Sequence, residues 1–460
     1  MQSEGSSAVE DLFAVPVNSH HLVFSPRRNL AAVVNTTAAE ALSHWAATSE
    51  NNRAEIVVLR DLVGSLREPP ATVAIHAGPA RPVFLGLVVT RACNMACRYC
   101  DFLPEQSSRS MTPELAVSAI NAWVRHQQRV GEHRLELHFF GGEPFVQGDL
   151  VQIAVHHTRA LAARHGMTTH FEASTNGLMK ERDLEFVRRH FDAIVLSLDG
   201  PQPDQDRHRP LTGGRSGFEQ VCQTARALSD SPVELCIRCC VSQTNMAHLP
   251  ATAEWFANEF QPSVVDFEPL SETEPSVRAG LVPPHPYAFA TGFIRARRIL
   301  QAAGIQCVYA AAPEKPRRVF CPVGQDAFIV SPAGSVRSCY LRQSQWKARG
   351  LDLEIGQITS GDMFIDLHAV ERLRSLAADR LRCTTCFCRW TCAGGCLVRE
   401  ADAERAGRRT NFCRLTRLVQ ACVLLEDMGQ PHLVDQLLGD SEAMDALSGQ
   451  ADDRLGTNGA

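Results

Sequence analysis

Three cysteines stand close together near residue 100, in the segment Cys93-Asn-Met-Ala-Cys97-Arg-Tyr-Cys100, directly after the apolar run 83–90. Three thiolates at this spacing suit three corners of one [4Fe–4S] cube and leave the fourth iron without a protein ligand. An iron with an open coordination position can bind and activate a substrate, whereas a cluster with four cysteine ligands mainly carries electrons. The alternative interpretations of the triplet are a zinc knot or scattered core cysteines.

The triplet, with the aromatic residue Tyr99 before its last cysteine, resembles that of the radical S-adenosylmethionine (SAM) superfamily. The resemblance implies that the three thiolates hold the cluster and that its open iron chelates the amino and carboxylate groups of SAM. It implies further that one electron cleaves the sulfonium to a 5′-deoxyadenosyl radical, which abstracts hydrogen from a substrate. Tyr99 is assigned to the SAM site on the same ground.

Polar motifs follow the next three predicted strands. They are Gly141-Gly142-Glu143-Pro144, Ser174-Thr175-Asn176-Gly177 and Ser197-Leu198-Asp199-Gly200. Adjacent glycines let the backbone approach a ligand closely, and a carboxylate can receive an ammonium group. In order and position the motifs resemble those of the superfamily, which implies contact with the SAM amino group by the first and with its ribose and carboxylate by the others. The contacts are assigned to Gly141, Gly142, Glu143, Pro144, Ser174, Asn176, Ser197 and Asp199. Each motif alone is as well explained as a polar turn.

Two arginines are candidates for binding the SAM carboxylate. Arg209 lies in Asp206-Arg-His-Arg-Pro, which resembles a superfamily segment, and Arg238 lies within the fifth apolar run. A buried arginine needs a partner, which could equally be a structural carboxylate. A substrate base is also expected, and His138, Asp266 and Glu268 lie on predicted strands. Because strand residues more often pack or form salt bridges, no catalytic residue is assigned.

A second group of cysteines fills the C-terminal part of the chain. It consists of Cys321, Cys339, Cys383, Cys386, Cys392, Cys396 and Cys413, with Gly334 between the first two. This pattern resembles the SPASM domain of radical SAM enzymes that modify peptides and proteins, whereas a zinc ribbon needs only four such residues. The resemblance implies two auxiliary [4Fe–4S] clusters, one on Cys383, Cys386, Cys392 and Cys413 and one on Cys321, Cys339 and Cys396. Relatives often supply the fourth ligand of the latter from the position that is Lys315 here, so Cys307, Cys388 and an open iron remain as alternatives.

Composition limits the class of protein and its compartment. The chain has 460 residues, is 45% hydrophobic and 21% charged, and carries a net charge of −5. These values describe a globular protein of two or three domains and argue against a nucleic-acid surface. The chain has no signal-like N-terminus and no apolar run long enough to span a membrane, so a cytoplasmic location is expected. Seventeen cysteines are better explained there by cluster ligation than by disulfides.

The residues between 82 and 270 alternate between strand-like and helix-like segments. Apolar runs rich in β-branched residues lie at 83–90, 134–140, 168–174, 192–198, 233–241 and 263–269. Six such repeats predict an α/β fold, a partial (β/α)6 TIM-type barrel with its chemistry at the carboxyl ends of the strands. Thr112-Pro113-Glu114 predicts the start of a helix, because Thr is a good cap and Pro suits the first helical position.

The residues before and after this barrel are expected to form separate parts of the protein. We expect a small α+β module at 1–78, the barrel at 79–270, a bridging region at 271–316 with a helix at 286–303, the SPASM domain at 317–425, and a helical or disordered tail at 426–460. Residues 21–35 predict two strands around a Pro-Arg-Arg-Asn turn, followed by helices from Asn35 to Ala47 and over about 54–66. This order resembles the PqqD-like domain that binds leader peptides; the alternative is a structural cap on the barrel. The last 20 residues or so are expected to be disordered.

The resemblance to radical SAM/SPASM enzymes covers about 82–415. It implies oxidative modification of a ribosomally made precursor peptide by hydrogen abstraction, with a side-chain crosslink as the product and the auxiliary clusters removing an electron. The expected partners are that peptide, with residues 1–78 as its candidate binding module, and a flavodoxin or ferredoxin as reductant; no nucleic acid or membrane is expected. The alternatives are a sulfatase-maturase-like oxidation to formylglycine, and a non-catalytic electron carrier or peptide-binding scaffold.

Overall fold

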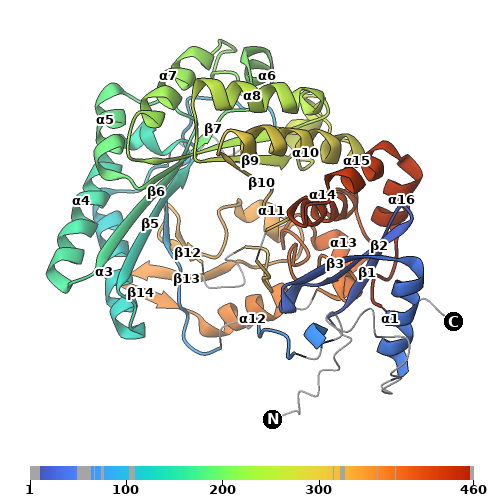
Figure 1. Ribbon diagram of the computed structural model, residues 1–460. Helices are drawn as coiled ribbons and strands as arrows, with labels where there is room; N and C mark the ends of the chain where they lie inside the picture. Colours follow the sequence, from blue (N-terminus) through green and yellow to red (C-terminus); the bar gives the residue numbers. More distant parts are fainter. Residues whose placement is uncertain are drawn as a thin grey trace.

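A computed structural model describes residues 11–48, 64–66, 68–73, 77–102, 109–313, 315–321, 327–359, 361–378 and 380–455. These residues contain a three-stranded sheet of order β1-β2-β3 and an eleven-stranded sheet of order β10-β9-β8-β7-β6-β5-β4-β11-β12-β13-β14 (Figure 1). Among the described helices, none combines the length and the apolar character that a membrane span requires.

Six parallel strands form the centre of the large sheet. They are β4 (Leu85–Thr90), β5 (Arg134–Gly141), β6 (Thr168–Thr175), β7 (Ala193–Ser197), β8 (Glu234–Val241) and β9 (Val264–Pro269). They coincide with the six apolar runs, so the predicted parallel sheet is confirmed. Helices cover its outer face (Figure 1): α3 (Pro113–Val130), α4 (Gly148–His165), α5 (Glu181–His190), α6 (Gln202–His208), α7 (Phe218–Ser229) and α8 (Leu249–Glu259).

Local signals explain where these elements begin and end. The Thr112 hydroxyl accepts a hydrogen bond from the Leu115 amide at 3.2 Å, and Pro113 is the first residue of α3, as the sequence predicted. The helix stops at Gly131, which adopts φ +76° in the left-handed region. The bridging helix is also confirmed, as α10 (Pro286–Ala302).

The cysteine-rich region continues the barrel sheet. Strand β11 (Phe328–Val330) pairs in parallel with β4, and β12 (Ser335–Arg337), β13 (Glu354–Thr359) and β14 (Asp362–Ile365) follow in antiparallel order. Its helices are α11 (Gln343–Lys347), α12 (Leu367–Ala378), α13 (Ala401–Arg405) and α14 (Asn411–Asp427). At the opposite edge, β10 (Gln306–Val308) pairs in parallel with β9. The sheet therefore joins the region of the triplet to the region of the C-terminal cysteines.

The N-terminal module is an antiparallel sheet with one helix. The predicted strands are confirmed as β2 (His20–Ser25) and β3 (Leu30–Asn35), and α1 (Thr36–Thr48) begins where the Asn35 side chain accepts a bond from the Ala38 amide. Strand β1 (Phe13–Val17) was not predicted. Most of the second predicted helix lies outside the described residues; residues 64–66 are described and are helical.

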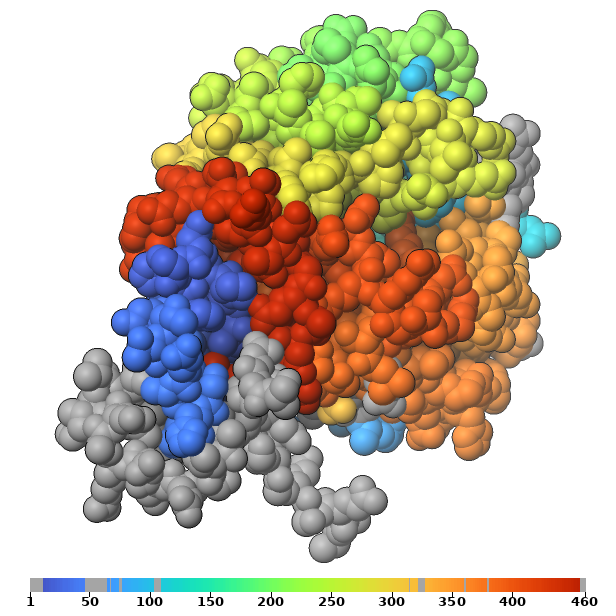
Figure 2. Space-filling view, turned by 90° about the vertical axis from the view of Figure 1, so that its right-hand side faces the viewer, coloured from blue at the N-terminus to red at the C-terminus, as the bar shows by residue number. Residues whose placement is uncertain are grey.

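The expectation of a disordered C-terminus is wrong for residues 441–455. Helices α15 (Pro431–Gly439) and α16 (Ser441–Gly449) are ordered, and α16 buries Met444 and Leu447. Beyond α16 the chain pairs with the N-terminal module, since the Ala14 amide donates to the Asp453 carbonyl at 2.7 Å. Both views place the module beside the C-terminal helices (Figures 1 and 2). Most residues of this tail are polar, so the few residues that bury against the rest of the protein were not recognised from the sequence.

Asp453 holds the tail through a fully buried ion pair with Arg417, whose guanidinium donates to the Asp453 carboxylate at 2.8 Å. We expect Asp453→Asn to lower the free energy of unfolding by about 3 kcal/mol, because the Arg417 charge stays buried without a counter-charge. The neighbouring Asp452→Asn is the control: Asp452 pairs with Arg454 in a partly exposed position and should change stability by less than about 1 kcal/mol. Urea unfolding measures both; equal losses would contradict this account.

Candidate functional site

The three cysteines of the triplet lie close enough to interact electrostatically, in the loop after β4. Burial raises the pKa of the Cys93 thiol to about 11 and that of the Cys97 thiol to about 12. These thiolates are therefore favoured only when a positive group such as an iron centre binds them. The side-chain amide nitrogen of Asn176 donates a hydrogen bond to the Cys93 sulfur at 3.6 Å. The donor set fits a cluster.

The two glycines of the next motif pack against the loop that carries the triplet. A Cβ on Gly141 would lie 2.4 Å from the Thr90 carbonyl oxygen, and one on Gly142 would lie 2.2 Å from that of Ala92. The Gly142 amide also donates to the Thr90 carbonyl at 2.8 Å. The close approach that these glycines allow is thus to the protein's own backbone, immediately before Cys93.

We expect Gly142→Ala to displace the triplet loop, because backbone atoms occupy the space that the new methyl group needs. The variant should lose about 2 kcal/mol of stability, typical of overpacking, and its SAM cleavage should fall at least about tenfold. Gly439→Ala is the matched control, since a Cβ there meets no atom within 4 Å. Urea unfolding and 5′-deoxyadenosine assays compare the two; a Gly142→Ala variant as stable and active as Gly439→Ala would contradict the packing argument.

Glu143 connects the first and second motifs. Its buried carboxylate accepts hydrogen bonds from the Thr175 hydroxyl at 2.8 Å and from the backbone amide of Asn176 at 2.7 Å. Burial raises the pKa of Glu143 to about 7, although these hydrogen bonds act to lower it. Pro144 follows as the first residue of a short 3-10 helix. Ser174, on β6, and Ser197, at the end of β7, are half-buried.

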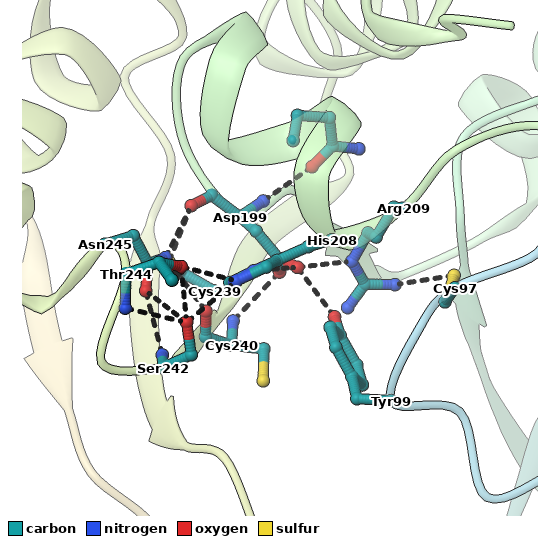
Figure 3. Close-up of polar contacts among 11 residues, drawn as sticks. Cys97, Tyr99, Asp199, His208, Arg209, Cys239, Cys240, Ser242, Thr244 and Asn245 are labelled. Carbon is teal, nitrogen blue, oxygen red and sulfur yellow. Dashed lines mark hydrogen bonds and ion pairs between the residues drawn. The ribbon is translucent and has the colours of Figure 1, made fainter. Parts of the chain in front are cut away.

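Asp199, after β7, is the centre of a buried polar network (Figure 3). Its carboxylate accepts bonds from the Tyr99 hydroxyl at 2.7 Å, from Arg209 Nε at 2.9 Å and from the Cys240 amide at 2.9 Å, and His208 Nδ1 lies at 3.2 Å. Burial alone would raise the pKa of Asp199, but the Arg209 guanidinium and His208 hold it well below its usual range. The carboxylate is therefore ionised and fully engaged within the protein.

Arg209 connects this network to the triplet. One edge of its guanidinium is bound to Asp199, while another nitrogen lies 4.0 Å from the Cys97 sulfur (Figure 3). Its charge lies 5.2 Å from the centre of the Tyr99 ring. The role of Arg209 toward the SAM carboxylate stays a prediction. Sequence reasoning missed His208, which is buried and bonded to the Ser242 hydroxyl at 2.9 Å, although it lies inside the quoted segment beside Arg209.

Arg238 has the structural partner that the sequence left open. Its Nε donates to the Asp266 carboxylate at 2.7 Å across neighbouring strands β8 and β9. Of the three candidate bases, Asp266 is engaged in this pair and His138 is bonded to Glu136 at 2.9 Å. Glu268 lines a cavity, and burial together with the charge of Asp266 raises its pKa.

The C-terminal cysteines form two groups. Cys339 interacts with Cys321 and Cys396. In the second group, Cys392 interacts with Cys383, Cys386 and Cys413. Members of each set implied by the SPASM pattern thus lie near enough to interact electrostatically, and their role as cluster ligands stays a prediction. The strongest interaction of the Cys388 thiol is with Cys386, whereas Cys307, on β10, interacts with Arg297 and Asp266.

A cavity of about 520 Å³ lies between the barrel and the cysteine-rich region. The barrel lines it with Tyr99, Arg209, Arg238, Cys240 and Glu268. The C-terminal region lines it with Cys321, Cys339, Tyr340, Cys396 and Arg399. Residues beside the triplet and residues of the first C-terminal group therefore line the same cavity.

Residues 87–256 match a protein-family model described as the radical SAM superfamily. These residues form a radical SAM region. The radical SAM region accounts for SAM and one [4Fe–4S] cluster as cofactors. The chain is similar to the serine-type anaerobic sulfatase-maturating enzyme of Klebsiella aerogenes, with 25% identity over 222 residues, 47% of this chain and 54% of that protein. It is also similar to the PqqA peptide cyclase of Bradyrhizobium diazoefficiens, with 23% identity over 331 residues, 68% of this chain and 81% of that one.

The chain spans about half the length of the sulfatase-maturating relatives that it matches. Two solved structures extend the likeness in fold. Native anSMEcpe with bound AdoMet aligns with a TM-score of 0.59 and 19% identity, covering 76% of this chain and 98% of that one. SuiB of Streptococcus suis bound to S-adenosylmethionine aligns with a TM-score of 0.51 and 12% identity, covering 87% and 98%. The likeness extends well beyond residues 87–256 and confirms the predicted fold class.

Proposed function

We propose that this radical SAM protein reductively cleaves SAM and oxidatively crosslinks side chains of a ribosomally made precursor peptide. One observation carries the proposal: the cavity of about 520 Å³ is bordered both by Tyr99 and Arg209, beside the triplet, and by three C-terminal cysteines. That volume lies in the range of ligand sites and suits a peptide side chain with its neighbours.

In this proposal Cys93, Cys97 and Cys100 hold the SAM-binding cluster. When bound there, the cluster and SAM supply the 5′-deoxyadenosyl radical. Arg209 faces the Cys97 sulfur with its free edge, which suits an interaction with the SAM carboxylate. The buried Asp199 carboxylate fixes the guanidinium and the Tyr99 ring in place. The C-terminal groups hold two auxiliary clusters, for three in total, and give the electron released by net oxidation a route away.

The comparisons support a peptide substrate. The name of the PqqA peptide cyclase states cyclisation of a peptide, and anSMEcpe has been solved with AdoMet and the Cp18Cys peptide bound, with a TM-score of 0.58 and 17% identity to this chain. The likeness to sulfatase-maturating enzymes equally favours the second candidate, oxidation of a serine or cysteine to formylglycine. Mass spectrometry of the treated peptide separates the two, since a crosslink joins two side chains whereas formylglycine leaves a hydrazine-reactive aldehyde on one.

Residues 1–78 are the proposed binding module for the peptide's leader. Strand β3 is an edge strand of the three-stranded sheet, and such an edge can accept an extended peptide by strand addition. The contacts of β1 with the tail support the alternative, a structural cap. A flavodoxin or ferredoxin as electron donor and a cytoplasmic location stay predictions.

Anaerobic reconstitution tests the proposal. About twelve irons per chain, with 5′-deoxyadenosine formed from SAM and dithionite, would support a radical enzyme with three clusters. About four irons without SAM cleavage would overturn it and favour the non-catalytic carrier or scaffold.

A further inference from the structure

A pocket of about 220 Å³ lies beside the second C-terminal cysteine group. Of the four cysteines in that group, only Cys383 lines the pocket. The pocket therefore lies on the outer side of the group and not between its thiols. Leu381 and Thr384 also line it and are exposed, although Cys383 itself is buried. A cluster held by Cys383 would thus lie close to the surface of the protein.

The wall of this pocket carries positive charge. Arg318, Arg380 and Arg389 line it, and none of the described residues that line it is acidic. Arg380 is paired with Glu404, whose carboxylate accepts a hydrogen bond from its Nε at 3.0 Å. Arg318 is exposed, and the charge of Arg389 lies 5.0 Å from the centre of the Trp390 ring. An anionic group is the ligand that such a wall attracts.

The sequence around the pocket has the same sign when every residue is counted. Segments 314–318 and 379–389 contain six basic residues against two acidic ones. Glu400 and Glu404 pair with two of the six, Arg380 and Arg382, which still leaves a surplus of two positive charges. The whole chain, in contrast, carries a net charge of −5. Positive charge is therefore concentrated at this face of an otherwise acidic protein.

An apolar side chain accompanies the arginines. Leu381 is 76% exposed, more than any other large apolar side chain in the described part of the chain. A single exposed leucine is common on protein surfaces, but this one lies on the pocket that the arginines line. Small interfaces that combine a few apolar contacts with charge are typical of transient electron-transfer complexes.

A short segment links the second cysteine group to the large cavity. Cys396, of the first group, lines that cavity, and Cys392, of the second group, stands four residues before it. Four residues span at most about 14 Å. The segment is shorter than that, because the Gly395 amide donates to the Cys392 carbonyl in a turn, at 3.1 Å. Clusters on the two groups would therefore form a short path from the cavity to Cys383.

We propose that the face formed by Arg318, Leu381, Thr384 and Arg389 is the docking surface of a one-electron carrier protein with an acidic surface. The inference rests on the proposed function, in which oxidation of the peptide releases an electron to the C-terminal clusters. The docked carrier takes that electron: the reduced cluster beside Cys383 is oxidised by one electron, and the flavin or iron–sulfur centre of the carrier is reduced by one. A carboxylate of the carrier enters the arginine-lined pocket, and Leu381 contacts an apolar side chain beside it.

The test uses the full-length variant with Cys93, Cys97 and Cys100 replaced by alanine, so that only the C-terminal clusters can pass electrons. The reconstituted protein is reduced with dithionite, freed of the excess, and mixed in a stopped-flow instrument with one of two oxidants. One is oxidised flavodoxin, an acidic carrier, and the other is duroquinone, a small neutral molecule that needs no docking surface. Arg318→Glu should lower the rate constant for flavodoxin about tenfold at low ionic strength and by less at high salt. The rate constant for duroquinone should stay within about twofold.

Two further variants separate docking from net charge. Arg189→Glu makes the same change of charge on α5, at a side chain that is 72% exposed, and should change the flavodoxin rate by less than about twofold. Leu381→Ser removes the apolar contact without a change of charge and should slow flavodoxin at every salt concentration. Equal slowing by Arg318→Glu and Arg189→Glu would overturn the proposal, because net charge would then explain the effect. The proposal also fails if neither Arg318→Glu nor Leu381→Ser slows flavodoxin more than duroquinone.

Iron content distinguishes failure of this inference from failure of the proposed function. The triple variant should contain about eight irons per chain after reconstitution. A lower content would contradict the two C-terminal clusters of the proposed function. At about eight irons, a flavodoxin rate that none of the substitutions changes would contradict the docking surface alone.

Discussion

Cys97→Ala is expected to abolish formation of 5′-deoxyadenosine. Cys97 is the middle cysteine of the triplet, and its thiol is buried beside Arg209. Two thiolates cannot hold a cube, so iron content should fall by about four per chain while the C-terminal groups keep theirs. We expect a loss of activity of more than about 100-fold with dithionite as reductant. Retained cleavage of SAM in this variant would contradict the proposal that the triplet holds the SAM-binding cluster.

A matched control separates the cluster from the packing of a buried thiol. Cys222, on α7, is fully buried, and its strongest interactions are with Arg226 and two glutamates. Cys222→Ala should keep both iron content and SAM cleavage, with a stability loss of about 1 kcal/mol. Similar losses of iron in the two variants would mean that the Cys97 effect comes from misfolding.

Asp199→Asn is expected to have the largest effect on stability. The substitution removes the charge that holds Arg209 at 2.9 Å and leaves the guanidinium buried without a counter-charge. Loss of one partner of a buried pair costs about 3 to 5 kcal/mol. Asparagine offers one acceptor oxygen and one NH2 group, so either the Cys240 amide or the Tyr99 hydroxyl and His208 face a donor in place of an acceptor, and the SAM site should also become less ordered. We expect SAM cleavage to fall by more than about tenfold.

Asp204→Asn, on the adjacent helix α6, is the control for this prediction. Asp204 is buried, but its partner His248 is 58% exposed, so the substitution should cost less than about 1 kcal/mol. Urea unfolding of both variants, together with SAM binding by equilibrium dialysis, measures the difference. If Asp199→Asn proved no more destabilising than Asp204→Asn, the buried network would not be the support that its hydrogen bonds indicate.

Sequence patterns identified the parallel strands because each is a local run of apolar residues. The helix at Pro113 was equally local, since its cap and first residues are adjacent in the chain. Strands β11 and β12 were not predicted, because three residues carry no usable periodicity. The pairing of β11 with β4 joins Phe328 to Leu85 across more than half of the chain. Such contacts depend on tertiary packing alone.

The sequence predicted which residue types form the candidate site, but it did not predict the ion-pair partners of those residues. Cysteine spacing predicted three sets of thiols, and members of each set lie near enough to interact electrostatically. It did not indicate that Asp199 binds Arg209 or that Asp266 binds Arg238, since pairing depends on how neighbouring strands align. The ordered tail was missed for a similar reason: the carboxylate of Asp453 finds its arginine only in the folded protein.

The continuous sheet has a consequence for electron transfer. Cys93 follows β4 and Cys339 follows β12, which lies two places further along one hydrogen-bonded sheet. Neighbouring strands keep a spacing of about 4.8 Å, so the distance between the two thiol groups is fixed by backbone hydrogen bonds and not by a hinge between domains. Tunnelling rates fall steeply with distance. Under the proposed function, a shared sheet would keep the distance between the clusters, and with it the rate of electron exchange, constant.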